Sequence, residues 1–297
     1  MAVQTAIKKP ASQRRPRGKT QHPDGAKTKS ATGFSHDESR DIQEQARLRA
    51  PMIYEIVRRE GEEEMNRPAA SLWWSGLAAG LSISFSLLAQ AILQVHLPDA
   101  PWRPLVTGLG YSVGFLLVVL GRQQLFTENT ITVVLPVAAA PSLAALRALG
   151  RMWGIVLAAN LVGTLLAAVF CSFAPVVTPE LRAAMLSISA RALAPGPVEL
   201  FFRAITAGFL IAAMVWLLPS AEGAKFWVIT LMTYLIAIGG FAHLIAGSFE
   251  AFMLAVGGEI DPMRMLIDFA IPVLLGNVVG GAALFALISY AQVAKET

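Results

Sequence analysis

Charge is scarce in this 297-residue sequence. Asp, Glu, Lys and Arg together make up 15% of the residues, whereas about a quarter is usual in a soluble domain. Apolar residues reach 55%, and the mean hydropathy is +0.57. A composition this apolar excludes an intrinsically disordered chain and an ordinary soluble enzyme, so we expect a membrane protein and no enzymatic activity.

Other absences narrow the class further. Cys171 is the only cysteine, which excludes an intrachain disulfide and a cysteine-based metal cluster. The sequence has no P-loop and no glycine fingerprint for a dinucleotide, and His22, His36 and His96 have no metal-ligand partners at suitable spacing inside an apolar segment. The polar N-terminal residues do not form a secretory signal. We therefore expect no cofactor and no metal. We also expect no nucleic-acid partner, because a net charge of +4 is only weak evidence for nucleic-acid binding.

The few charges are unevenly placed. Residues 1–67 hold 14 of the 24 Lys and Arg and 10 of the 20 Asp and Glu, which predicts a basic cytoplasmic tail followed by a transmembrane domain at 68–297. Residues 1–35 are rich in Lys, Arg, Pro, Gly and Ser, and we expect them to be disordered. Residues 36–66 have the pattern of an amphipathic helix. This tail either lies electrostatically against anionic lipid, or its helix is a regulatory element that caps the inner mouth.

Long uncharged stretches define the membrane domain. A membrane helix needs about 20 mostly apolar residues. Six spans are predicted, at 69–93, 105–137, 152–174, 200–218, 225–257 and 266–292. The second and fifth are interrupted near their middle by polar residues, and we interpret each as a broken helix.

The basic residues orient these spans. With the tail inside, the inner segments hold the tail's Lys and Arg together with Arg147, Arg151, Lys225 and Lys295, whereas few basic residues fall in the outer loops. Positive charge favours the cytoplasmic side. Both termini are therefore predicted to be cytoplasmic.

The chain contains an internal repeat. Residues 160–163 and 277–280 share the pattern Asn-x-Val-Gly inside an apolar span, and Gly80 and Gly208 lie in similar Ala-Gly contexts. Each half then has three spans, and because three is odd the second half must be inverted in the membrane. Inverted repeats with broken helices at the midplane are typical of transporters.

The two breaks occupy corresponding positions, with Phe126 matched to Phe241. A short half-helix is expected to begin after each break, near Asn129 and near Ser248. Helix N-termini carry partial positive charge and free N–H groups. Two such ends meeting at the midplane would favour an anion.

His243 is the only ionisable side chain in the middle of the fifth span, which marks it as a functional residue. Its ordinary pKa of about 6.5 suits a proton-passing group or a hydrogen-bond donor. The alternative is a neutral imidazole that satisfies nearby backbone. Thr127, in the opposite break, either caps the half-helix or faces the pore. Glu128 and Glu250, the latter expected in the first turn of its half-helix, are interpreted as carboxylates that satisfy the helix dipoles or neighbouring donors.

Three segments resemble the formate/nitrite transporter family, in particular a longer-tailed branch of it. Residues 111–127 resemble its second span and the hallmark loop that follows, residues 241–246 resemble its second hallmark, and residues 207–216 resemble its fourth span. The resemblance extends over residues 68–292.

This resemblance implies an aquaporin-like protomer with six helices, a homopentamer with one pore in each protomer, and a place in the bacterial inner membrane. The family conducts small monovalent anions such as formate and nitrite. His243 matches its central histidine and Thr127 its loop threonine. The positions matching its apolar constrictions are Tyr111, Phe115, Leu125, Ile211 and Ile236.

The sequence departs from the family pattern at Ala242, where Glu is frequent, and at Gly247 and Gly208, where Asn is frequent. Ile236 also replaces an aromatic residue. The polar losses at 242, 247 and 208 are expected to lie around His243.

The predicted function is transport of a small monovalent anion, or its acid, with His243 lowering the cost of burying the charge. Two alternatives stay open. One is a passive channel for neutral solutes, although neither break carries the Asn-Pro-Ala motif of an aquaporin. The other is a membrane scaffold that transports nothing and recruits partners through its tail.

Overall fold

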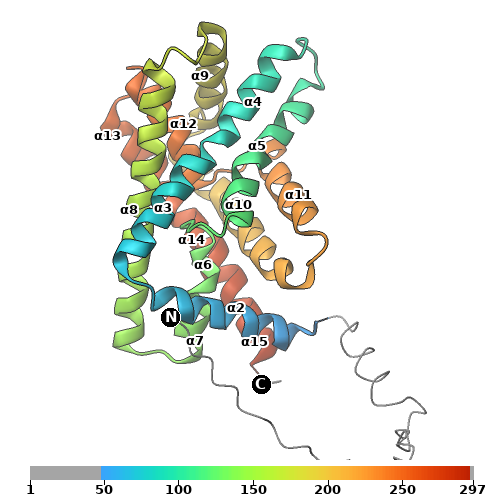
Figure 1. Cartoon of the computed structure of the whole chain (residues 1–297), viewed down its shortest axis with the longest axis vertical. Coiled ribbons are helices and arrows are strands. Elements are labelled where there is room, and N and C mark those ends of the chain that lie inside the picture. Colours follow the sequence, from blue (N-terminus) through green and yellow to red (C-terminus); the bar gives the residue numbers. More distant parts are fainter. Residues whose placement is uncertain (1–47, 295–297) are drawn as a thin grey trace, which may run out of the picture. The chain divides into compact units, whose positions relative to one another are not determined.

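The computed structural model describes residues 48–294, and within these residues the chain is helical with no strand (Figure 1). They belong to one compact unit that begins at Leu48. The predicted disorder of residues 1–35 and the first part of the helix at 36–66 lie outside the described residues. The prediction of an all-α polytopic membrane protein is confirmed.

The first half of the membrane domain has one bent, one broken and one long span. Their helices are α3 (Ala69–Ile83) and α4 (Phe85–His96); α5 (Arg103–Leu120), α6 (Asn129–Thr132) and α7 (Val134–Ala139); and α8 (Leu143–Phe173). Span 3 starts at Leu143 instead of at residue 152, because Ser142 caps it by accepting a hydrogen bond from the Ala145 N–H. The predicted start at residue 152 marks the end of the uncharged stretch, whereas the helix itself continues past that stretch to Leu143.

The second half repeats this plan after a connecting helix, α9 (Pro179–Leu193). Its helices are α10 (Pro197–Leu217) with the 3₁₀ turn η1 (Leu218–Ser220); α11 (Lys225–Ile238) and α12 (Leu244–Val256); and α13 (Pro262–Arg264), the π-helical η2 (Met265–Ala270), α14 (Ile271–Val278), the π-helical η3 (Val279–Ala286) and α15 (Leu287–Val293). Among the described residues, five helical segments are long and apolar enough to cross a membrane, and they lie in spans 1, 2, 3, 4 and 6. The two pieces of span 5, α11 and α12, are each shorter.

The halves are packed in inverted order. In the first half α3 packs on α8, and in the second α10 packs on α14 and η3. Each short half-helix crosses to the other half, since α12 packs on α8 and α6 packs on η3. Span 1 leaves the end of the bundle that holds α2 and α15, whereas span 4 leaves the end that holds α9 (Figure 1). This arrangement confirms the inverted repeat and both broken spans.

The two broken helices stop in the same way. The Gln123 N–H donates to the Val118 carbonyl over 3.0 Å, and the Phe241 N–H donates to the Ile236 carbonyl over 3.0 Å. The residues just before them, Arg122 and Gly240, have φ angles of 52° and 61°. A left-handed residue with this bond pattern is a regular way to terminate a helix.

The equivalence of the two breaks corrects two expectations. The backbone N–H groups that donate to the repeated asparagines are those of Phe126 and Leu244, so these two residues correspond. The predicted pairing of Phe126 with Phe241 is therefore wrong. The second half-helix also begins at Leu244 and not near Ser248, because His243 caps it, which places Glu250 in its second turn.

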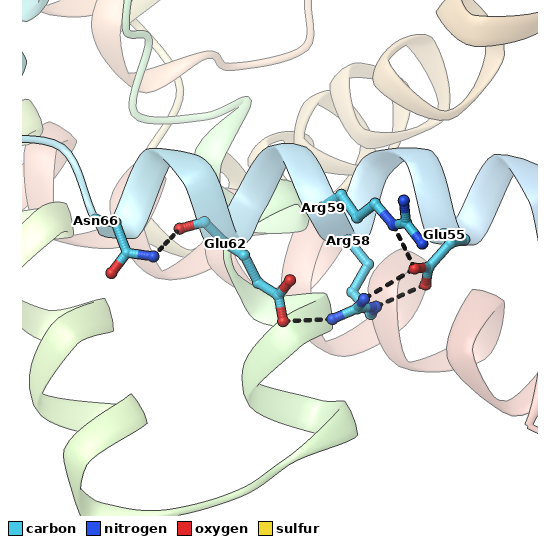
Figure 2. Close-up of polar contacts among 5 residues, drawn as sticks. All are labelled: Glu55, Arg58, Arg59, Glu62 and Asn66. Atoms are coloured by element: carbon cyan, nitrogen blue, oxygen red, sulfur yellow. Dashed lines mark hydrogen bonds and ion pairs between the residues drawn. The ribbon is translucent and has the colours of Figure 1, made fainter.

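Before the first span, α2 (Ala50–Met65) falls within the segment predicted to be an amphipathic helix. Its exposed side carries ion pairs at helical spacing, with Arg58 between Glu55 and Glu62 and Arg59 on Glu55 (Figure 2). Hydrogen bonds from Arg58 and Arg59 lower the pKa of Glu55 from 4.5 to about 2. The Asn66 amide donates to the Glu62 carbonyl at the last turn. These i,i+3 and i,i+4 contacts favour the helix.

The opposite side of α2 is apolar and docks on the membrane helices. Ile53, Tyr54 and Val57 are buried there. Tyr54 lies 6.0 Å from the ring of Tyr290 on α15, and the same cluster includes Leu135 of α7. The helix therefore belongs to the compact unit, at the end where the first and last described helices meet.

The left-handed termini generate a matched pair of stability predictions. Gly240→Ala should destabilise the protein by about 1–2 kcal/mol, because a Cβ is disfavoured at positive φ, and this Cβ would also lie 2.9 Å from Nη1 of Arg203. Arg122→Gly should stabilise it by up to about 1 kcal/mol for the same conformational reason. Thermal unfolding in detergent measures both. Opposite signs are required, so a neutral or stabilising Gly240→Ala would contradict this account of the breaks.

Candidate functional site

His243 and Thr127 meet where the two breaks come together. Thr127 Oγ1 lies 2.6 Å from His243 Nε2, and both side chains are almost fully buried. The Ala246 N–H donates to His243 Nδ1 over 3.2 Å, so Nδ1 acts as an acceptor. A neutral imidazole with an acceptor Nδ1 carries its proton on Nε2. The ring therefore donates to the Thr127 hydroxyl while it caps α12.

Thr127 does not cap its half-helix. The half-helix begins at Asn129 with no side-chain cap, and the Thr130 hydroxyl donates to the Thr127 carbonyl. The capping interpretation of Thr127 is thus wrong, and its hydroxyl is available to the histidine because Asn160 holds the loop from the other side.

Two asparagines satisfy the backbone at the breaks. The Asn160 amide donates to the carbonyls of Gly76 and Gln124 over 2.8 and 2.9 Å, and its Oδ1 accepts from the loop. Asn277 holds the other break in the same way, through the Ala242 carbonyl at 3.0 Å. Each unsatisfied backbone group in hydrocarbon would cost several kcal/mol. The asparagine of the Asn-x-Val-Gly repeat is therefore present in both halves because each break needs a side chain that satisfies its backbone groups.

Apolar side chains close the route around the histidine. The five residues assigned to constrictions all lie in one hydrophobic cluster and are at most 7% exposed: Tyr111, Phe115, Leu125, Ile211 and Ile236. The Phe115 ring stands edge-on to the His243 ring at 5.0 Å. Tyr111 and Ile236 also line a cavity.

That cavity, of about 230 Å³, is lined in part by Ile188 and Arg191 of α9, and we call it the α9-side vestibule. His243, Glu250 and Phe269 also line it. Sequence reasoning missed Phe269 altogether. The expected place of Glu250 in the first turn of its half-helix is wrong, because the helix begins at Leu244; the residue lies in the second turn and lines the cavity.

A second, larger cavity has a volume of about 810 Å³, and we call it the α2-side vestibule. It is lined by Glu60 and Glu64 of α2, by Arg122 and Glu128 of the first break, and by Lys225 at the start of α11. Thr127 lines neither vestibule. The two cavities are thus lined by α9 in one case and by α2 in the other, and His243 belongs to the lining of the first only.

The departures from the family pattern have different surroundings. A Cβ at Gly208 would lie 2.3 Å from the Asn277 carbonyl oxygen, so this position backs onto span 6 and does not face His243 as expected. A Cβ at Gly247 would lie 2.5 Å from the Phe269 ring, which occupies that part of the α9-side vestibule. Ala242 lines the same vestibule. Two of the three polar losses thus lie beside the cavity.

A carboxylate ties α2 to the first break. Glu64 accepts hydrogen bonds from Gln124 Nε2 at 3.0 Å and from Thr132 Oγ1 at 3.1 Å, and Gln124 in turn accepts from Asn129. Burial raises the pKa of Glu64 above its ordinary value of 4.5, against the lowering effect of these two hydrogen bonds. The helix outside the membrane is thus linked to the loop that carries Thr127.

Comparison with known proteins gives a consistent result. The profile of the family described as formate/nitrite transporter matches residues 51–291. The inner membrane protein YfdC of Escherichia coli is 44% identical over 84% of this chain and 80% of that protein. The formate channel FocA of Haemophilus influenzae is 27% identical over 73% of this chain and 84% of its own length. A solved pentameric formate channel with formate bound matches with a TM-score of 0.66 at 22% identity, covering 76% of this chain and 98% of that one.

The link through Glu64 predicts a pH-dependent docking of α2. A carboxyl whose pKa is raised in the docked state holds its proton more tightly there, so docking is strongest below about pH 4.5 and weakens as the pH rises through the raised pKa. Hydrogen-exchange protection factors of α2 at about pH 5 and about pH 7.5 measure this. Glu64→Gln should abolish the pH dependence, with exposed Glu63→Gln as its control. Equal pH dependence in both variants would exclude Glu64 as the cause.

The central pair predicts a specific effect of Thr127. Thr127→Val keeps the shape but leaves the buried Nε2–H without an acceptor, which costs about 1–3 kcal/mol. Thr127→Ser keeps the hydroxyl and should retain most of the stability. Thermal unfolding of both variants in detergent separates the hydroxyl from the methyl group. Equal loss in the two variants would mean that packing, and not the hydrogen bond, matters at this position.

Proposed function

The chain belongs to the formate/nitrite transporter family, and from this we propose that it transports a small monovalent anion of the formate and nitrite class, or its acid, through a pore in each protomer. One observation supports this most directly. The His243–Thr127 pair lies buried where two broken helices meet, and the domain has one vestibule lined by α9 and His243 and another lined by α2. A polar centre with an apolar surround suits a solute that must shed its water to pass.

The barrier for such a solute is electrostatic. Removing a bare charge from water into an apolar constriction costs far more than removing a neutral acid. At the constriction the solute meets the hydroxyl of Thr127 and the imidazole of His243, which supply hydrogen bonds that water no longer provides. Because the Ala246 N–H occupies Nδ1, the geometry favours a neutral histidine that positions and donates over one that shuttles a proton.

We further propose a homopentamer in the bacterial inner membrane with both termini cytoplasmic. The relatives support this, since one is a pentameric channel and another an inner membrane protein. Large apolar side chains exposed on the single protomer, such as Phe173, Trp227 and Val198, would then face lipid or a neighbouring protomer. The basic tail is proposed to lie near anionic lipid headgroups.

The first test is flux of formate and of nitrite into vesicles containing the reconstituted protein, at two pH values. We expect uptake of both, greater when the pH outside is lower. His243→Asn keeps the ability to cap α12, because asparagine is a good cap, but it lacks the imidazole. Loss of a charge-assisted hydrogen bond of about 1.5–3 kcal/mol corresponds to roughly a 10- to 100-fold loss of flux.

His243→Ala removes both the cap and the imidazole, and serves as the comparison. If His243→Asn transports as well as the unmodified protein, the histidine has only its capping role. Osmotic swelling with neutral solutes and no anion flux would support the neutral-solute channel instead. If neither anion flux nor osmotic swelling is observed, the remaining alternative is a membrane scaffold that transports nothing.

A further inference from the structure

Two carboxyl groups, that of the buried Glu250 and that of the half-buried Glu128, lie on opposite sides of the His243–Thr127 centre, and the mechanism above does not use them. Glu250 of α12 lines the α9-side vestibule and is 8% exposed. Glu128, in the first break, lines the α2-side vestibule, and its Oε1 is enclosed without a hydrogen-bond partner among the described residues. Carboxyl groups enclosed in a membrane domain without an ion pair need a reason, since leaving one there is expensive.

The arginines near Glu250 are committed elsewhere. Arg191 of α9 lines the same vestibule, but its guanidinium donates to Gln94 Oε1 at 2.9 Å. Arg203 of α10 pairs with Glu199 at 2.6 Å. Neither forms a described ion pair with Glu250. The carboxyl therefore faces the cavity and not a fixed cation.

The remaining neighbours of Glu250 contribute little charge. Tyr111 of α5 lies within electrostatic reach of it, and His243 also lines the cavity. Of the elements packed against α12, α3 and α14 carry no charged residue, and the charged or titratable side chains of three others are exposed: Arg147 and Arg151 of α8, His96 of α4 and Asp268 of η2. Besides Arg191, α9 carries the exposed Glu180 and the half-buried Arg182, and neither lines the cavity. A solute in this vestibule thus meets Glu250 as its nearest carboxyl.

Glu128 has a comparable position at the other end. The nearest charges are Glu64 and Glu60 of α2 and Arg122 of its own loop. Arg122 already faces Glu60 at 3.5 Å. Further charged residues of this vestibule are Glu63, Arg67, Glu222 and Lys225. None of them forms a described ion pair with Glu128.

We propose that Glu250 and Glu128 exchange a proton with the permeating weak acid, one on each side of the central pair. This inference rests on the proposed function. The Glu250 carboxyl gives its proton to an oxygen of the anion, so one O–H bond breaks and another forms, and the resulting carboxylate takes a proton from hydronium in the vestibule. The neutral acid passes His243 and Thr127. Glu128, as carboxylate, accepts the proton on the far side and releases it to water, so that one anion and one proton cross together.

The central pair cannot replace these carboxyls in this geometry. Nδ1 of His243 is occupied by the Ala246 N–H, and Nε2 already holds the proton that bonds Thr127. Protonating the ring would break the cap of α12. The carboxyls sit in the vestibules, where water can supply and remove a proton.

The test combines formate flux with proton uptake, followed by a pH-sensitive dye inside vesicles, in Glu250→Gln and Glu128→Gln. Exposed carboxylates that line neither vestibule provide matched controls, Glu259→Gln for the first and Glu62→Gln for the second. The unmodified protein and the controls should import about one proton for each formate, and their flux should rise less steeply with falling pH than the concentration of undissociated acid does, because Glu250 supplies the proton.

In Glu250→Gln, only formic acid that is already undissociated in solution should cross. Flux should then rise about tenfold for each unit fall in pH above the pKa of formic acid, in proportion to that acid. When formate is supplied at the α9 side, Glu128→Gln should reduce the flux that arrives at the α2 side. Unchanged flux and unchanged pH dependence in both variants would overturn the inference and leave the proposed function standing.

A second readout does not depend on the solute. A hydrophobic carbodiimide reacts with protonated carboxyl groups, and mass spectrometry locates the adduct. We expect modification at Glu250 and Glu128 and none at the exposed Glu259 or Glu62. If the unmodified protein transports no weak acid, the proposed function fails, and labelling of Glu250 and Glu128 would still support their role in holding a proton. Absence of labelling would overturn that role.

Discussion

The structure depends on one constraint, the need to satisfy backbone N–H and C=O groups where two helices break inside the membrane. Water cannot do this in hydrocarbon, and an open loop there is not tolerated. Asn160 and Asn277 solve the problem with one side chain each, accepting from one N–H and donating to carbonyls of two different segments. Because the amide reaches three groups at once, it fixes both the loop and the neighbouring span. The close packing of α3 on α8 and of α10 on α14 follows from that geometry.

Once the breaks are held, the position of the central pair is determined. His243 begins α12 as its cap and Thr127 precedes α6, so the two side chains converge from different halves of the chain. The cap bond sets the tautomer of the ring, and the tautomer sets which atom donates to Thr127. A residue that the sequence marks only as an ionisable side chain in a membrane span thus acquires a defined hydrogen-bonding direction from its place at a helix start.

Much of this was readable in the sequence, because it rests on local patterns. Hydropathy gives the spans, the Asn-x-Val-Gly pair gives the repeat, and the breaks mark His243 and Thr127. The predictions are wrong where the position of a residue depends on a contact between segments that are distant in the sequence. Phe126 and Phe241 are both apolar residues at a break, but it is the Leu244 N–H that donates a hydrogen bond to Asn277 Oδ1. Hydropathy could not show that Gly208 backs onto span 6, or that Glu250 lines a cavity, because both depend on the approach of another helix.

The two vestibules differ in charge, and the difference bears on what crosses. The α2-side vestibule is lined by five carboxyl groups and three basic side chains, which repels a free anion at that mouth. On the α9 side two arginines line the cavity, and their guanidinium groups are bonded to Gln94 and to Glu199. In the proposed mechanism a solute that arrives there as an anion crosses the constriction as a neutral acid, and so avoids the cost of burying a bare charge. Once it is an anion again, the acidic end favours its release into water, because the carboxyl groups there repel it.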